Sequence, residues 1–243
     1  MRTKLMNLLV VLVLTTATAY GQKSTFFGIG GALNYDVYEF TDPGNTLKET
    51  PLPAGSWGFT VCQEISDFLM LESGFVQKEY WEGYGYNVES FDIGSSASSY
   101  ATFQIPLRLK TKINLLKDKI ALNPVVGINY AVNSEYGYGL GYGGGSLQTE
   151  EIKITTTYTE DVNLKKSFLL LETGLQFEFV ILKDFLVGLN AGYLNGFDKV
   201  SQIEYDYGVN DGELQKAYAH SNGSYWNLGL AVSYRVSDFW LKE

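Results

Sequence analysis

Eight segments of this chain alternate between large apolar residues and small or polar ones. In the clearest segment, residues 103–113, Phe, Ile and Leu stand at nearly every second position, with Gln104, Arg108 and Lys110 between them. Successive side chains of a β-strand point to opposite faces of its sheet, so this period of two predicts strands with one apolar and one polar face. The eight segments are residues 27–37, 57–65, 68–75, 103–113, 120–140, 169–181, 185–193 and 226–235.

The connections between these segments alternate in length. Three are short, at residues 66–67, 114–119 and 183–184, and the related phrases ISDF, LKDK and LKDF mark them, with a further copy, VSDF, after the last segment. Four are long and rich in polar residues, Tyr or Gly, at about residues 40–54, 82–99, 143–164 and 196–223. Eight antiparallel strands with both termini on one side need three turns on that side and four on the other. The connections match this requirement.

This pattern predicts an all-β fold, an eight-stranded antiparallel transmembrane up-and-down β-barrel of the bacterial outer-membrane type. A sheet in lipid must close on itself because lipid cannot bond to free backbone groups. Aromatic residues are expected at the two membrane interfaces. Phe68, Phe185, Phe239 and Trp240 would lie at the short-turn rim, and Tyr35, Tyr80, Trp81, Tyr130, Tyr193 and Trp226 at the other.

A soluble barrel of the lipocalin kind, or a secreted sandwich, would also alternate in this way. Such folds bury their apolar face inside. Here the opposite face is rich in Gly, Ala, Ser and Asn with a few charges, which suits a narrow polar lumen better. The asymmetry between short turns and long loops also favours the membrane barrel.

The N-terminal residues have the layout of a secretory signal peptide. Arg2 and Lys4 precede an apolar core and a run of small residues, with cleavage expected after Ala19 or Gly21. We therefore expect a signal peptide at residues 1–21 and a single barrel domain at residues 22–243, located in the bacterial outer membrane with both termini in the periplasm. The net charge of −9 makes nucleic acid an unsuitable partner. Cys62 is the only cysteine, which excludes an internal disulfide.

Several stretches resemble the PorT-like outer-membrane β-barrel domain. They are FFGIGGALNYDV, LMLESGFVQKEY, FQIPLRLKTKI, NPVVGINYAV and LGLAVSYRVSDFW. The chain is also similar, more distantly, to the OmpA-type and OmpX-type eight-stranded barrels. The resemblance covers nearly the whole mature chain and implies an outer-membrane location and a small barrel. It does not imply one activity, because fold does not fix function.

Charged residues on the small-residue face predict an ion-pair network inside the barrel. Glu72 stands opposite Arg108 and Lys110 on the neighbouring segment, within reach of an ion pair. The predicted network comprises Glu64, Glu72, Arg108, Lys110, Lys112, Glu178 and Arg235. It would either plug a narrow barrel or act as a charged gate. Asp36 and Glu172 are placed higher, where they could belong to a vestibule.

The long loops contain tyrosines that could contact proteins or sugars. The candidates are Tyr84, Tyr86, Tyr136, Tyr138 and Tyr142. The alternative is that they continue the interfacial girdle into strand extensions, and residues 154–159 read as one such extension. GLGYGG at residues 139–144 formally matches a dinucleotide motif, but the expected helix does not follow it.

The sequence predicts a protein without catalytic residues, cofactors or metal sites. His220 is the only histidine, and it lies beside Ser221 in the fourth long loop, with Asp206 and Asp211 nearby in sequence. We expect a structural, adhesion or complex-assembly role, with outer-membrane lipid as partner and envelope proteins or surface glycans as further candidates. A narrow pore or transporter for ions or small hydrophobic solutes is the alternative, and a loop-sited hydrolase or acyltransferase is a weaker one.

Overall fold

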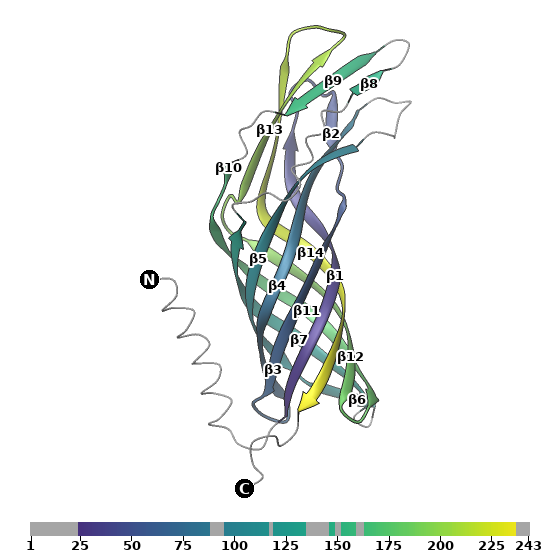
Figure 1. The fold of residues 1–243 in the computed structure, drawn as a ribbon, viewed down its shortest axis with the longest axis vertical. Coiled ribbons are helices and arrows are strands. Elements are labelled where there is room, and N and C mark those ends of the chain that lie inside the picture. Colours follow the sequence, from purple (N-terminus) through teal and green to yellow (C-terminus); the bar gives the residue numbers. More distant parts are fainter. Residues whose placement is uncertain are drawn as a thin grey trace.

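The protein is all-β in the computed structural model, which describes residues 24–87, 95–116, 119–134, 146–148, 152–158 and 163–236. Within these ranges, fourteen strands form one antiparallel sheet (Figure 1). The strands are β1 Thr25–Thr41, β2 Leu47–Glu49, β3 Pro53–Glu64, β4 Leu69–Tyr86, β5 Ser95–Thr111, β6 Ile113–Leu116, β7 Ile120–Asn133, β8 Ser146–Gln148, β9 Lys153–Tyr158, β10 Asn163–Leu164, β11 Ser167–Leu182, β12 Phe185–Gly196, β13 Ser201–Val209 and β14 Gln215–Val236.

Eight long strands close into a ring, as the sequence predicted. Each is hydrogen-bonded to the next in the order β1, β3, β4, β5, β7, β11, β12 and β14, and β14 pairs back with β1. The strands cross the barrel at a tilt, and the start of β1 and the end of β14 meet at the same rim (Figure 1). The tight turn at Lys183 and Asp184 joins β11 to β12 on this rim. The repeated phrase therefore marks the short-turn rim.

The wall has an apolar outer face and a polar inner face. Ile29 and Leu228 are 66% and 62% exposed on the outside, whereas Asn34, on the inner face of β1, is 0% exposed. A water-exposed belt of this kind would be unstable, because it leaves large apolar side chains uncovered over the whole circumference. The belt confirms the predicted membrane barrel with its apolar face turned outward. None of the described residues forms a helix long and apolar enough to cross a membrane.

Aromatic residues lie near both edges of the belt. Phe68 and Phe185 are exposed at the short-turn rim, and Tyr35, Tyr130 and Trp226 are exposed near the opposite edge. The residues expected at positions 239 and 240 lie outside the described part of the chain.

One predicted girdle residue was placed on the wrong face. Tyr80 is 0% exposed and points into the lumen, because it shares the inner face of β4 with Glu72 and Lys78. On the outer face of β4, Gln77 and Glu79 follow Phe75, and this change from apolar to polar marks the end of the belt on that strand.

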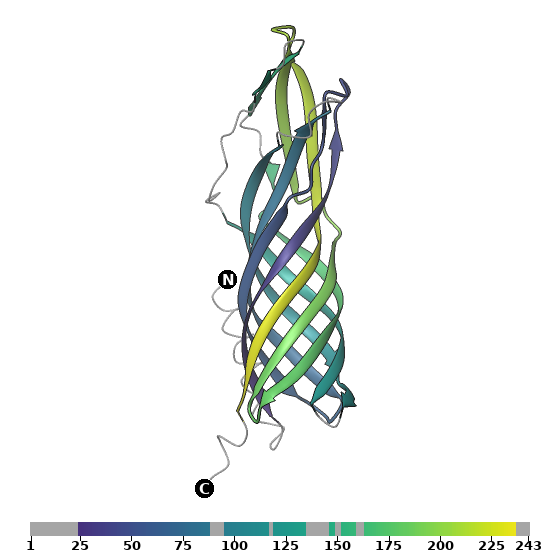
Figure 2. The ribbon, with the colours of Figure 1, turned by 90° about the vertical axis from the view of Figure 1, so that its right-hand side faces the viewer.

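The strands continue well beyond the belt and form what we call the head (Figure 2). The head consists of β2, β8, β9 and β13 with the adjoining parts of β1, β4 and β14. Residues 82–86, 95–99 and most of 196–223 were predicted as loops, but they are strands. The predicted extension at residues 154–159 is confirmed for residues 154–158 by β9, which covers Lys153–Tyr158, and residue 159 lies outside the described part of the chain.

The head has a hydrophobic core of its own. Its buried members are Tyr38, Leu47, Tyr84, Tyr86, Leu147, Ile154, Ile203, Tyr205, Tyr207, Ala217 and Ala219. They come from β1, β2, β4, β8, β9, β13 and β14, so the core ties together segments far apart in the sequence. The head is therefore a packed unit and not a set of separate loops.

An irregularity in β14 joins barrel and head. Asp36 of β1 pairs with Tyr225, but Tyr38 pairs with Ser221, so β14 holds extra residues between these two rungs. Gly223 lies in this stretch with a φ of 82°. A Cβ at this position would come within 2.8 Å of the Phe168 ring, so only glycine fits both the space and the left-handed backbone.

Candidate functional site: a lumen closed at two levels

The lowest level of the lumen is a small apolar cluster near the short-turn rim. Phe26, Cys62, Met70 and Leu186 pack together there, and all four are buried. The guanidinium of Arg235 lies over the Phe26 ring, with 5.2 Å between its carbon and the ring centre. Arg235 was predicted to join the ion-pair network, but it instead covers this apolar cluster.

An ion-pair layer centred on Glu72 lies above the apolar cluster. Arg108 stands directly opposite Glu72 on β5, and its Nη1 donates to Glu72 Oε1 at 2.9 Å. Lys110 Nζ donates to the other oxygen, Glu72 Oε2, and also to Gln176 Oε1 at 2.7 Å. Arg108 Nε donates to Glu172 Oε2 at 2.8 Å. The layer thus spans the lumen from β4 and β5 to β11.

The other predicted members of this network lie differently. Lys112 Nζ and Glu64 Oε1 form a separate pair, 3.4 Å apart, nearer the short-turn rim. Glu178 is close enough to Lys110 for an electrostatic interaction, but the Lys110 ammonium donates its hydrogen bonds to Glu72 and Gln176. Glu172 was expected in a vestibule, but it belongs to the Arg108 layer.

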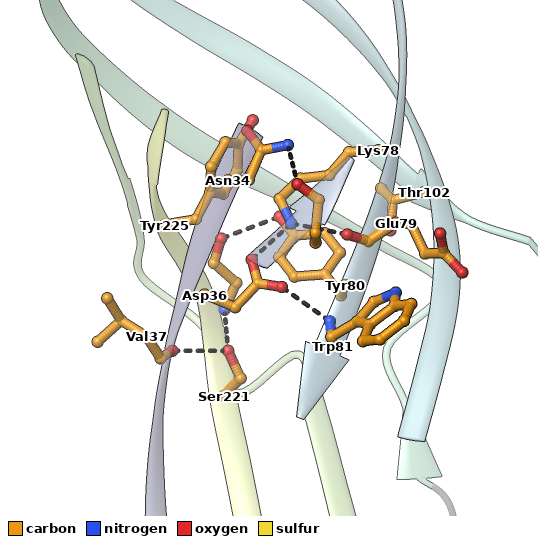
Figure 3. Close-up of polar contacts among 12 residues, drawn as sticks. Asn34, Asp36, Val37, Lys78, Glu79, Tyr80, Trp81, Thr102, Ser221 and Tyr225 are labelled. Atoms are coloured by element: carbon orange, nitrogen blue, oxygen red, sulfur yellow. Dashed lines mark hydrogen bonds and ion pairs between the residues drawn. The ribbon is translucent and has the colours of Figure 1, made fainter. Parts of the chain in front are cut away.

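A third layer closes the lumen at the level where the belt ends, and Figure 3 shows its polar contacts. Lys78 Nζ lies 2.5 Å from Asp36 Oδ1, and both side chains are 0% exposed. The second carboxylate oxygen of Asp36 accepts a hydrogen bond from the backbone N–H of Trp81 at 2.8 Å. Asp36 is thus not in an open vestibule, as the sequence suggested, but inside a closed layer.

Aromatic rings complete the surroundings of Lys78. Its Nζ lies 3.6 Å from the centre of the Tyr80 ring and 4.5 Å from that of Tyr225, and it donates to the carbonyl of Glu79 at 3.1 Å. A buried ion pair loses its hydration and is tolerated only when other contacts replace the water. The carboxylate, the carbonyl and the two ring faces supply these contacts.

The tyrosines of this layer are held by their hydroxyl groups as well as by packing. Tyr80 stacks on Tyr100 with ring centres 5.0 Å apart and meets Tyr225 edge to face at 5.7 Å. The Tyr80 hydroxyl donates to the carbonyl of Gly223 at 2.9 Å. Gly223 lies in the irregular stretch of β14, so this stretch supplies the acceptor. The Tyr225 hydroxyl donates to Gln104 Oε1 at 3.0 Å. We call Asp36, Lys78, Tyr80, Tyr100 and Tyr225 the upper seal.

The upper seal was not predicted from the sequence. The apolar alternation on the third segment ended at Phe75, so Lys78 was not assigned to a face. A usable signal was present in the sequence. Positions 78, 80 and 82 lie at even separations from Glu72, so their side chains must be on the same face as Glu72 if the strand continues.

Glu82 lies above the upper seal, beyond the polar residues that end the belt on β4. Its side chain is 0% exposed. Oε1 accepts hydrogen bonds from the hydroxyls of Ser201 and Tyr100, the latter at 3.2 Å, while Oε2 has no hydrogen-bond partner among the described residues. Burial raises the pKa of Glu82 to about 7, although these two hydrogen bonds act in the opposite direction.

A cavity of about 110 Å³ lies within the barrel. Its lining includes Arg108, Glu172, Asn190, Asn227 and Tyr225. The side chains of Arg108 and Glu172 remain 18% and 12% exposed, because they border this space. Its lining mixes polar and apolar groups, and the upper seal bounds it through Tyr225.

Two of the loop tyrosines predicted to contact partners are buried instead. Tyr84 and Tyr86 are 1% and 6% exposed, because both point into the core of the head from the inner face of β4. The Tyr84 hydroxyl donates to Thr156 Oγ1 at 2.9 Å. The other three candidates, Tyr136, Tyr138 and Tyr142, lie outside the described residues, as does the glycine motif at 139–144.

His220 lies on a strand and not in the predicted loop. Its Nε2 is 2.9 Å from Glu39 Oε2 of the paired strand β1. Ser221 points to the opposite face, where it is 2% exposed and donates to the carbonyl of Val37 at 3.0 Å. Histidine and serine therefore do not meet. Within the described ranges, no three His, Cys, Asp or Glu side chains group to hold a metal ion.

Comparisons with known proteins add little beyond the fold. No protein-family model matches the sequence, and no curated protein matches it. A major outer membrane protein of Thermus thermophilus is 12% identical over 88% of this chain and 99% of its own, with a TM-score of 0.45. Neisserial surface protein A is 8% identical over 87% and 97%, with a TM-score of 0.43.

Outer Membrane Protein W of E. coli is 12% identical over 89% of this chain and 100% of its own, with a TM-score of 0.40. These proteins are small outer-membrane β-barrels. Likenesses this weak carry none of their functions over to this chain. The PorT-like resemblance stays a prediction from the sequence.

Proposed function

We propose that this chain is a non-catalytic outer-membrane scaffold whose sealed barrel anchors a folded head at the cell surface, in an adhesion or complex-assembly role. The upper seal carries this proposal. Lys78 and Tyr80 are 0% exposed across the lumen, so the space that a channel would need is filled by packed side chains. An eight-stranded barrel has room for little more than its own side chains.

The head supports the same proposal. A barrel that served only to span the membrane would not need a second hydrophobic core outside it. The head's core fixes its strands relative to the barrel wall, and rigid scaffolds that position exposed segments are the usual basis of partner binding. We place the head outside the cell and the short-turn rim in the periplasm, since short turns face the periplasm in barrels of this type.

A narrow pore for ions or small solutes is the second candidate. The charged Arg108 and Glu172 that border the cavity favour it, because rings of charge set selectivity in channels. Conduction would require the upper seal to move. An enzymatic role has less support, since the His220 side chain faces away from Ser221, and Asp211 is held by Lys153 at 2.8 Å.

Single-channel recording of the refolded protein in a planar bilayer tests the proposal. We expect a folded barrel without discrete openings, with folding checked by the heat-dependent shift in gel mobility. A porin of known conductance serves as the control for detection. Reproducible open steps from the wild-type protein would contradict the sealed scaffold. A variant trimmed in the apolar cluster and in the upper seal, Met70→Ala with Tyr80→Ala, shows whether these two layers are what blocks the current.

A further inference from the structure

Three exposed lysines lie close together where the barrel passes into the head. Lys165 and Lys166 precede β11, and Lys199 precedes β13, with all three exposed to solvent. The backbone N–H of Lys165 donates to the carbonyl of Val200 at 2.8 Å, which holds the two segments side by side. We call Lys165, Lys166 and Lys199 the lysine shelf.

The backbone fixes the shelf to the barrel wall. Asn133, at the end of β7, donates its N–H to the carbonyl of Lys166 at 3.0 Å. Its side-chain Nδ2 donates to the carbonyl of Lys165 at 2.7 Å. The side chain of Asn133 also accepts a hydrogen bond from Thr102 Oγ1 at 2.6 Å, so the anchor extends to β5. The lysines therefore stand at a defined height on the wall.

That height is immediately above the lipid-facing belt. Leu169 of β11 is 52% exposed and pairs with Tyr130 of β7, which is 47% exposed. Phe197, next to the shelf, is 68% exposed. One rung of the wall thus carries exposed aliphatic and aromatic side chains, and the lysines begin just beyond it. A bilayer changes in the same direction, from hydrocarbon through the interface to phosphate.

We propose that the lysine shelf binds the phosphate groups of lipid headgroups in the membrane leaflet on the head side. The inference rests on the proposed function, because it requires the barrel to span a membrane with its head outside. Lysine is a phosphate ligand that acts as a point charge on a flexible stem, so three neighbouring lysines can follow a mobile headgroup. The three lysines gather positive charge at one place in a chain whose net charge is −9.

Asp198 competes with a lipid phosphate for one lysine of the shelf. Lys165 Nζ lies 2.7 Å from Asp198 Oδ2, and the two side chains are 41% and 52% exposed. An exposed pair of this kind is weak, and a phosphate can displace the carboxylate from the lysine. Removing the charge of Asp198 should therefore strengthen lipid binding.

Native mass spectrometry of the folded protein in zwitterionic detergent micelles tests the proposal, with lipid A carrying two phosphates as the probe. Three variants are compared: Lys165→Gln with Lys166→Gln and Lys199→Gln; Asp198→Asn; and, as the matched control, Lys48→Gln with Lys153→Gln and Lys216→Gln in the head. The shelf variant should bind lipid A at least about tenfold more weakly than the wild type. The control should stay within about twofold, and Asp198→Asn should bind more tightly.

Equal losses in the shelf and control variants would overturn the proposal, because they would show a general effect of charge. A difference that persists with dephosphorylated lipid A would also overturn it. Inorganic phosphate that competes at concentrations similar to those of lipid A would indicate a site for the free ion and not for a membrane lipid. Failure of the wild type to fold into a bilayer would contradict the proposed function, whereas a folded barrel indifferent to the shelf would contradict only this inference.

Discussion

Substitution of Glu82 by Gln should remove a large part of the pH dependence of the protein's stability. Burial raises the pKa of Glu82 from 4.5 to about 7, so the folded state holds this proton more tightly than the unfolded state does. A raised pKa stabilises the folded state fully below pH 4.5, and this contribution is lost as the pH rises through about 7. The unfolding free energy of the wild type should thus fall between pH 4.5 and about 7, and the Glu82 carboxyl should change it little above that range.

The size of the effect follows from the two pKa values. Each pH unit between them is worth about 1.4 kcal/mol, so the interval from 4.5 to about 7 corresponds to about 3 kcal/mol. No discount for solvent screening applies, because the Glu82 side chain is 0% exposed. Glutamine keeps an acceptor for Ser201 and Tyr100, but it places an amide where Oε2 has no partner among the described residues. Glu82→Gln is therefore expected to be less stable at low pH but to lack the decline.

Guanidinium unfolding of the refolded protein in detergent micelles, at pH values from about 4.5 to about 8, measures this decline. Glu79→Gln is the matched control, since it removes a carboxylate from the outer face of the same strand. The wild type and this control should lose about 3 kcal/mol of unfolding free energy over the range, and Glu82→Gln much less. Parallel curves for the wild type and Glu82→Gln would refute the reasoning.

Two further substitutions test the lumen layers. Lys78→Met leaves Asp36 buried without its cation and should lower the unfolding free energy by about 3–5 kcal/mol. The double variant Lys78→Met/Asp36→Asn should recover part of this loss, and the surface control Lys48→Met should change the unfolding free energy little. A loss below about 1 kcal/mol in Lys78→Met would show that water enters the seal. Glu72→Gln leaves Lys110 without its carboxylate and should cost about 3 kcal/mol while the barrel stays electrically silent, whereas new conductance steps would favour the pore.

The barrel could be predicted from the sequence because lipid imposes a simple rule on its wall. Large apolar residues must face outward at every second position, and the segment at 103–113 does this at every such position except Thr111. The short turns were equally readable, since a turn such as Lys183 and Asp184 leaves no alternative to a hairpin. The pairing of Glu72 with Arg108 followed from counting residues away from these turns.

The head could not be predicted in the same way, because the rule reverses where the strands leave the lipid. On β4 the inner face carries Glu72 within the belt but Tyr84 and Tyr86 above it. On β14 the inner face carries Asn227 within the belt but Ala217 above it. A search for outward-facing apolar residues therefore ends at the belt and assigns the remaining strand to a loop. The sequence signal for such a head is an alternation that keeps its period of two residues while the inner face changes from polar to apolar.

The unbroken course of the long strands has a mechanical consequence. β14 runs for 22 residues through barrel and head, a contour of roughly 70 Å, and it is paired with β1, β12 or β13 over most of this length. A force applied to the tip of the head acts along the strands and loads their hydrogen-bond ladders in shear. Many rungs then share the load, instead of opening one after another as in peeling. Tension at the tip would thus be carried directly into the wall embedded in the membrane.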